Sequence, residues 1–218
     1  MSLFSWFCKF SIAPLVKFLF VKEIKGRKNI PKRNFILVSN HQSYLDVLID
    51  GSLCVPRNFH FIGRIDSWKG ISKIFVKGLY FIASVIPLNR NDKESKNKVI
   101  QKAIEVLKKG DVLIIYPEGT RTKTGKLQEG KYGVAKIFLK TGVPILPVGI
   151  KGTFELLPPH KKLKVKKIVT VNIGKPIFFK KELEKIKKIN KHSKEYSQIL
   201  AKITDEVMAS IASLISEE

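Results

Sequence analysis

Apolar residues along the chain fall into short continuous runs that alternate with longer segments of helical periodicity. The continuous runs predict strands over residues 35–39, 59–62, 85–88, 112–116, 145–150 and 168–173. The periodic segments predict helices over residues 45–53, 94–109, 130–140 and 196–215, and residues 180–194 form a basic connection or helix. Strands that alternate with helices are typical of an α/β fold. We therefore expect a mixed, largely parallel sheet flanked by helices over residues 26–218, preceded by a separate helical segment over residues 1–25.

That N-terminal segment is almost entirely apolar. Residues 3–21 contain only Lys9 and Lys17 as charged side chains, and Pro14 is expected to kink or split a helix there. The run is barely long enough to span a bilayer, and its two lysines would be costly in the hydrocarbon core. We expect amphipathic helices that lie in the membrane interface, with a single span or plain core packing as alternatives. Residues 67–82 alternate Lys with large apolar side chains, which predicts either core packing or another membrane-facing element.

The charge of the chain is strongly positive, because 41 Lys and Arg face 18 Asp and Glu, for a net charge of +23. Residues 151–194 alone contain fourteen Lys and three Glu. Such a field attracts nucleic acid, anionic lipid surfaces or acidic carrier proteins, although a solvated face has the same pattern. The basic cluster over residues 22–28 follows the apolar segment directly. On either membrane interpretation it would hold the body of the protein on the cytoplasmic side.

Cysteines and histidines indicate neither a disulfide framework nor a metal site. Cys8 and Cys54 are far apart and form no CxxC pattern, which fits a reducing compartment. None of the four histidines is paired at metal-ligand spacing. We expect no metal ion.

A histidine and an aspartate stand together where the first predicted strand gives way to a helix. His41 and Asp46 lie in the stretch Asn40-His41-Gln42-Ser43-Tyr44-Leu45-Asp46. Histidine is the side chain best suited to take a proton near neutral pH, and a carboxylate can orient it and stabilise its charged form. The pair therefore predicts a general base with its supporting acid. The alternative is a capping box, in which Ser43 and Asp46 only begin the helix and His41 is a polar loop residue.

A second polar turn follows the most apolar strand and has the sequence Pro117-Glu118-Gly119-Thr120-Arg121. Ligands of open α/β sheets bind beyond the carboxyl ends of the strands. Gly119 allows close backbone approach, Thr120 adds a hydroxyl, and Arg121 offers a fork for phosphate. Arg90 follows another short strand in the same way. The turn thus predicts an anion site, with an ordinary turn and a local Glu–Arg ion pair as the alternative.

Taken together, these stretches resemble the conserved blocks of the glycerolipid acyltransferase family, most closely its PlsC-type 1-acyl-sn-glycerol-3-phosphate (lysophosphatidate) acyltransferases. Residues 40–46 look like the H-x4-D block, and residues 117–121 look like the third block. Residues 84–90 resemble the second block, G-x-I-P-V-D-R, with Ser84 and Asn89 in place of the glycine and the acid. Residues 143–148 are similar to the fourth block.

The resemblance implies transfer of a fatty acyl group from acyl-CoA or acyl carrier protein to the sn-2 hydroxyl of lysophosphatidate, giving phosphatidic acid. It implies that His41 deprotonates the hydroxyl and Asp46 supports it, without an acyl-enzyme, a metal or another cofactor. The residues implied to hold the phosphate and glycerol are Arg90, Glu118, Gly119, Thr120 and Arg121. Anionic membrane lipids would be partners, with the protein monotopic or peripheral on the cytoplasmic face of the membrane, or anchored there by a single span.

Two other functions stay open at this point. A related acyltransferase could use another acceptor, such as glycerol-3-phosphate or a lyso-aminolipid. A basic nucleic-acid-binding protein would explain the net charge, but it would explain neither the apolar segments nor the paired motifs. Because the chain has no zinc-finger or RNP-like signature, we expect no nucleic acid partner.

Overall fold

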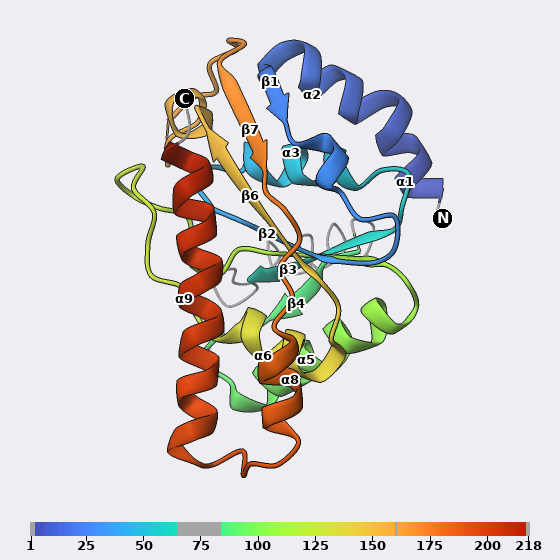
Figure 1. Cartoon of the computed structure of the whole chain (residues 1–218). Helices are drawn as coiled ribbons and strands as arrows, with labels where there is room; N and C mark the ends of the chain where they lie inside the picture. Colours follow the sequence, from blue (N-terminus) through green and yellow to red (C-terminus); the bar gives the residue numbers. More distant parts are fainter. Residues whose placement is uncertain (1–2, 65–83, 160, 217–218) are drawn as a thin grey trace.

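The computed structural model describes residues 3–64, 84–159 and 161–216 and is built on a seven-stranded sheet (Figure 1). The strands are β1 (Val21–Lys25), β2 (Ile36–Ser39), β3 (Phe59–Arg64), β4 (Ile86–Leu88), β5 (Val112–Ile115), β6 (Ile145–Lys151) and β7 (Val169–Ile173). Their order across the sheet is β1-β7-β6-β2-β5-β3-β4. Only β6 and β7 pair antiparallel, and the other neighbours pair parallel. The predicted α/β class with a mixed, largely parallel sheet is confirmed.

Helices cover both faces of this sheet, which explains why β2 and β5 are apolar and buried along their whole length. Successive strand residues point to opposite faces, so Leu37 packs with α3 (Leu45–Cys54) while Ile36 and Val38 pack with the other layer. That other layer contains α5 (Lys93–Lys108), α6 (Gly133–Thr141) and α9 (Lys194–Ser216). Three short elements connect the larger ones, namely α7 (Thr153–Leu156), α8 (Lys180–Ile186) and the 3₁₀ turn η2 (Arg27–Asn29).

Most predicted elements agree with the structure to within two residues at each end. Helix α6 begins at Gly133 and not at residue 130, because Lys131 N–H donates to the Pro117 carbonyl at 2.9 Å. The sequence pattern missed β1, which lies in the basic cluster after the apolar segment, and also α7. The prediction for residues 67–82 lies outside the described residues.

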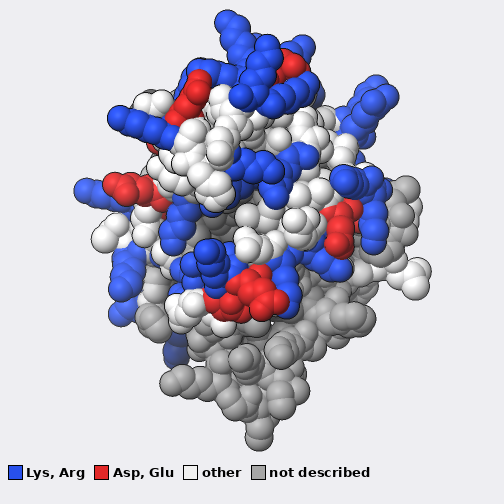
Figure 2. All heavy atoms as spheres, turned by 90° about the horizontal axis from the view of Figure 1, so that it is seen from below, with Lys and Arg blue, Asp and Glu red and all other residues white. Residues whose placement is uncertain are grey.

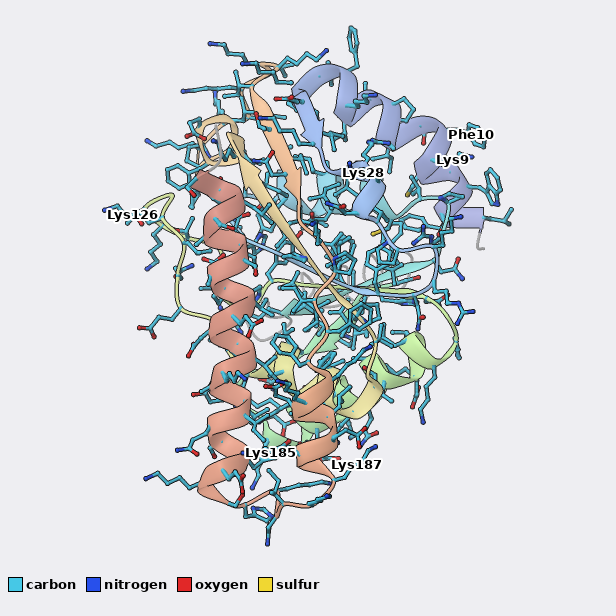
Figure 3. The ribbon with its side chains drawn as sticks, in the orientation of Figure 1. Lys9, Phe10, Lys28, Lys126, Lys185 and Lys187 are labelled. Carbon is cyan, nitrogen blue, oxygen red and sulfur yellow. The ribbon has the colours of Figure 1, made fainter. Side chains whose placement is uncertain are left out.

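The N-terminal segment is helical in three pieces, α1 (Leu3–Phe7), a π-helical turn η1 (Cys8–Ile12) and α2 (Ala13–Phe20). The pattern changes just before Pro14, as expected for a residue that has no N–H to donate. One side of the segment packs on the core. The other side exposes large apolar side chains, namely Leu3, Phe7, Phe10, Leu15 and Phe18. Figure 3 shows Phe10 and Lys9 on its outer side.

Within the described residues, no helix combines the length and the apolar character needed to cross a membrane. The exposed apolar side of the N-terminal segment is consistent with association with a membrane surface, as predicted. The proposed division of the chain at residue 25 stays a prediction.

Candidate active site

Four parallel neighbours, β2, β5, β3 and β4, end at the same edge of the sheet. The predicted residues follow these ends directly. His41 comes two residues after β2, Tyr116 comes immediately after β5, and Arg90 comes two residues after β4. Arg64 is the last residue of β3. The topology therefore brings the histidine, the polar turn and two arginines to one edge, where α/β folds bind ligands.

His41 and Asp46 form a hydrogen-bonded pair. The distance between His41 Nδ1 and Asp46 Oδ2 is 3.0 Å, and the Asp46 side chain is fully buried while 13% of the His41 side chain is exposed. Because Oδ2 accepts, Nδ1 donates its hydrogen, and Nε2 is left to accept a proton. Among the described residues, no group bonds Nε2. The pair thus has the geometry of a general base with its orienting carboxylate.

Asp46 also caps the helix that it opens. Its Oδ2 accepts the backbone N–H groups of Gln42 at 2.6 Å and Ser43 at 2.7 Å. The Ser43 hydroxyl accepts the Leu45 N–H at 3.2 Å, so the two side chains together bond three N–H groups at this end of the helix. The capping interpretation and the catalytic interpretation therefore describe the same carboxylate. Capping holds the carboxyl in place and so fixes the ring of His41.

Two further contacts hold His41. Its ring stacks on the ring of Tyr116, with centroids 3.9 Å apart and planes 12° apart. The preceding residue, Asn40, is buried and bonds both the N–H and the carbonyl of Ile150 at the end of β6, at 2.8 and 2.9 Å. The imidazole thus has little freedom to turn, as a preorganised base requires.

Glu118 is buried, and its two oxygens face protein groups. Oε1 accepts the His41 N–H at 2.6 Å, and Oε2 accepts the Gln128 N–H at 2.9 Å and its side-chain amide at 3.1 Å. Burial raises the pKa of this carboxyl, and the three hydrogen bonds oppose the rise. A further bond joins the Thr122 N–H to the His41 carbonyl at 2.9 Å. Glu118 therefore joins the polar turn to the histidine, in addition to any contact with a ligand.

A group of cations converges over Gly119. This glycine has a left-handed φ of +69°, and a Cβ built on it would lie 3.4 Å from Lys131 Nζ and 3.5 Å from Arg90 Nη2. Partial burial lowers the pKa of the Lys131 ammonium, and the positive charges of Arg90, Arg64 and Lys96 lower it further. Among the described residues, Lys131 makes no ion pair. Like charges gathered in this way repel one another, and an anion bound between them would relieve the repulsion.

The other two residues of the turn, Thr120 and Arg121, have different surroundings. The Arg121 guanidinium lies 3.7 Å from the ring centroid of Tyr44, a cation–π contact, and Tyr44 is itself exposed. Thr120 is exposed, and its carbonyl accepts from the Gln128 side chain. Both side chains are accessible from solvent.

Lys131 was not among the candidates found from the sequence, because one lysine in so basic a chain gives no local signal. Its position depends on the tertiary contact of two loops, in which its N–H bonds Pro117. The glycine before it, Gly130, gains a reason only in the structure, where an added Cβ would meet Met208 Cγ at 2.6 Å. In residues 3–64, 84–159 and 161–216, no three His, Cys, Asp or Glu side chains are grouped to hold a metal ion.

Comparisons with known proteins find relatives of this chain by sequence and by fold. A family model described as Acyltransferase matches residues 22–151. A chloroplastic 1-acyl-sn-glycerol-3-phosphate acyltransferase of Brassica napus is 35% identical over 172 residues, which cover 77% of this chain and 47% of that protein. The enzyme of the same name from Borreliella burgdorferi is 35% identical over 135 residues, covering 60% of this chain and 51% of that protein.

A solved structure is similar over nearly the whole chain. The crystal structure of the 1-acyl-sn-glycerophosphate (LPA) acyltransferase PlsC from Thermotoga maritima has a TM-score of 0.68 and 27% sequence identity, and the match covers 98% of this chain and 80% of that one. By contrast, the chain spans about half the length of the curated relatives it matches.

Proposed function

Because the chain belongs to the acyltransferase family, we propose that it transfers a fatty acyl group to the sn-2 hydroxyl of 1-acylglycerol-3-phosphate and so forms phosphatidic acid. The observation that supports this most directly is the His41–Asp46 pair at the sheet edge where Arg90 and Lys131 also converge. The named activity of the similar plant and bacterial proteins supports the choice of acceptor.

In this proposal the base and its carboxylate act on the acceptor directly. His41 Nε2 takes the proton of the sn-2 hydroxyl, and the negative charge of Asp46 stabilises the imidazolium that forms. The freed oxygen attacks the thioester carbonyl, the carbon–sulfur bond breaks, and the leaving thiolate receives the proton from His41. The step needs no enzyme nucleophile.

The acceptor phosphate would lie in the cationic group over Gly119. Arg90 and Lys131 supply charge-assisted hydrogen bonds, and the missing Cβ of Gly119 leaves room for an oxygen close to the backbone. Arg121 and Thr120 are placed to contact the glycerol or a second phosphate oxygen. Glu118 holds the turn against His41 and so fixes the distance between phosphate and base.

The donor and the membrane surface belong to the same proposal. We propose acyl-CoA or acyl carrier protein as donor and anionic membrane lipids as the surface, with the protein held on the cytoplasmic face by residues 1–25. Figure 2 shows Lys and Arg spread over the face seen from below, with Asp and Glu grouped among them in several places. Lys9 and Lys28, labelled in Figure 3, lie in the same upper part of the molecule as Phe10. Lys185 and Lys187 lie at the lower end and form ion pairs with Glu195 and Glu184. Each basic side chain close to an anionic leaflet contributes about 1 kcal/mol of attraction.

The experiment that tests the proposal follows labelled lysophosphatidate in the presence of acyl-CoA or acyl carrier protein. Labelled phosphatidate is expected with at least one donor, and glycerol-3-phosphate and a lyso-aminolipid serve as competing acceptors. If either competitor is acylated faster than lysophosphatidate, that competitor and not lysophosphatidate is the preferred acceptor. If no acceptor is acylated with either donor, the proposed acyltransferase activity is wrong.

Replacement of Lys131 by Met is expected to raise the KM for lysophosphatidate by roughly 10–100-fold with little change in kcat. The reason is that one charge-assisted hydrogen bond to phosphate contributes about 1.5–3 kcal/mol. Lys140→Met is the matched control. Lys131 lies just before α6, whereas Lys140 lies in its last turn, away from Gly119. Steady-state kinetics with lysophosphatidate and with monoacylglycerol check this result. An equal loss with both acceptors would argue against a phosphate contact.

Replacement of Phe10 and Phe18 together by Ser is expected to weaken binding to anionic vesicles by roughly a hundredfold. These side chains are 70% and 74% exposed, and burial of each in lipid contributes about 1.5–3 kcal/mol. Phe178→Ser is the control, since Phe178 is also exposed but lies just before α8. Vesicle co-sedimentation measures the effect. Binding equal to that of the wild type would mean that another surface docks on the membrane.

A further inference from the structure

A second carboxyl lies beneath the His41–Asp46 pair. Asp50 follows Asp46 by one helical turn on α3, and both side chains are fully buried. The Asp50 carboxyl lies within interaction range of the hydroxyls of Tyr116 and Ser39, which follow and end two adjacent strands. Tyr116 is the residue whose ring supports the ring of His41.

Several buried polar atoms around Asp50 have no hydrogen-bond partner in the described part of the chain. Both oxygens of Asp50, Oδ1 of Asp46 and the Tyr116 hydroxyl are buried, and none completes a hydrogen bond of good geometry with a described residue. A buried carboxylate without a partner is far costlier than a neutral carboxylic acid, which has one proton to donate. The hydroxyls of Tyr116 and Ser39 lie within interaction range of that carboxyl, and Asp46 is its neighbouring carboxyl on the same helix.

We propose that Asp50 is a positioning residue of the active site, which bonds the Tyr116 hydroxyl from within the core and so fixes the ring on which His41 stacks. This inference rests on the proposed acyl transfer, because it gives Asp50 a part in the orientation of the base. Asp50 does not touch substrate. It acts through Tyr116, and the established contacts of His41 with Asp46 are unaffected.

The electrostatics of the cluster favour this arrangement. Burial raises the pKa of the Asp50 carboxyl well above its usual range, and the nearby charge of Asp46 raises it further, while the hydroxyls of Tyr116 and Ser39 oppose the rise. Burial and the neighbouring carboxyls raise the pKa of the Tyr116 hydroxyl as well. The groups that face Asp50 are therefore the Asp46 carboxylate on the same helix, the neutral Cys54 thiol farther along it, and the Arg57 guanidinium beside that thiol. A neutral Asp50 leaves Asp46 as the single negative charge that supports the imidazolium.

Kinetics of three single variants and one double variant, Asp50→Leu with Tyr116→Phe, test the positioning role. Asp50→Asn keeps an uncharged hydrogen-bonding group and is expected to retain kcat within about threefold of the wild type, with the same pH profile of kcat. Asp50→Leu and Tyr116→Phe each remove one partner and are expected to lower kcat by roughly tenfold, with both KM values unchanged. The double variant is expected to be no slower than either single one, because the two groups act through one contact. Additive losses, or losses below twofold in both single variants, would overturn the proposal.

Thermal unfolding supplies a readout that needs no acyl transfer. The native protein keeps the Asp50 proton, whereas the unfolded chain releases it above a pH of about 3.9. Because the pKa of Asp50 is raised in the folded state, the wild type loses stability relative to Asp50→Asn as the pH rises above about 3.9. The difference in Tm is expected to widen until the pH reaches the folded-state pKa. A constant difference would show an ionised Asp50 and overturn the proposal. If the wild type forms no phosphatidate, the proposed function fails, while this measurement still decides the state of Asp50.

Discussion

Replacement of His41 by Ala is expected to lower kcat for phosphatidate formation by about 10²–10⁴-fold, the usual contribution of a general base. The imidazole is bonded to Asp46 through Nδ1 and stacked on Tyr116, and among the described residues nothing bonds its Nε2. The acceptor KM should change little, because the proposed phosphate contacts come from Arg90 and Lys131. Initial rates at saturating lysophosphatidate and donor measure the effect.

His192→Ala is the matched control for this experiment. His192 is exposed in the turn before α9, and its loss is expected to leave the rate unchanged. A folded His41→Ala protein with near-wild-type kcat would contradict the assignment of the base.

Replacement of Asp46 by Asn separates the two tasks of this side chain and is expected to lower kcat by about 10²–10⁴-fold while the fold stays intact. The amide oxygen can still accept the N–H groups of Gln42 and Ser43, so the cap survives. The amide has no charge, however, and it cannot stabilise the imidazolium of His41. Kinetics and thermal unfolding of the same preparation measure the two effects.

Asp46→Ala is the companion variant, because it removes both the charge and the cap. Loss of the cap is expected to lower its free energy of unfolding by about 0.5–2 kcal/mol, and therefore its Tm. The Tm of Asp46→Asn is expected to stay close to that of the wild type. Normal activity of the Asn variant would mean that Asp46 serves only to begin the helix.

The sequence pattern correctly predicted the strands in which every residue is buried. β2 and β5 are continuous apolar runs because helices cover both faces, and α5 has a clear helical period with a glycine after it. β1 escaped prediction because it is short and carries alternating charges, Lys22, Glu23 and Lys25. Its strand conformation depends on parallel pairing with β7, which lies far along the chain.

The candidate site was predictable where its residues are close in sequence. His41 and Asp46 lie within one strand-to-helix turn, and the structure places them in contact. Lys131 and Asp50 could not be ranked from the sequence, because their neighbours, Gly119 and Tyr116, come from other loops and strands. For Glu118 the sequence indicated a place at the anion site but not the bonds to His41 and Gln128, which depend on the meeting of two loops.

The most direct test of direct acyl transfer by the His41–Asp46 pair compares thiol release from acyl-CoA, or from acyl carrier protein, with formation of phosphatidate. We predict one thiol released for each phosphatidate formed, only when lysophosphatidate is present, with both signals lost together in His41→Ala. Thiol release without an acceptor, or an undiminished rate in His41→Ala, would contradict the account.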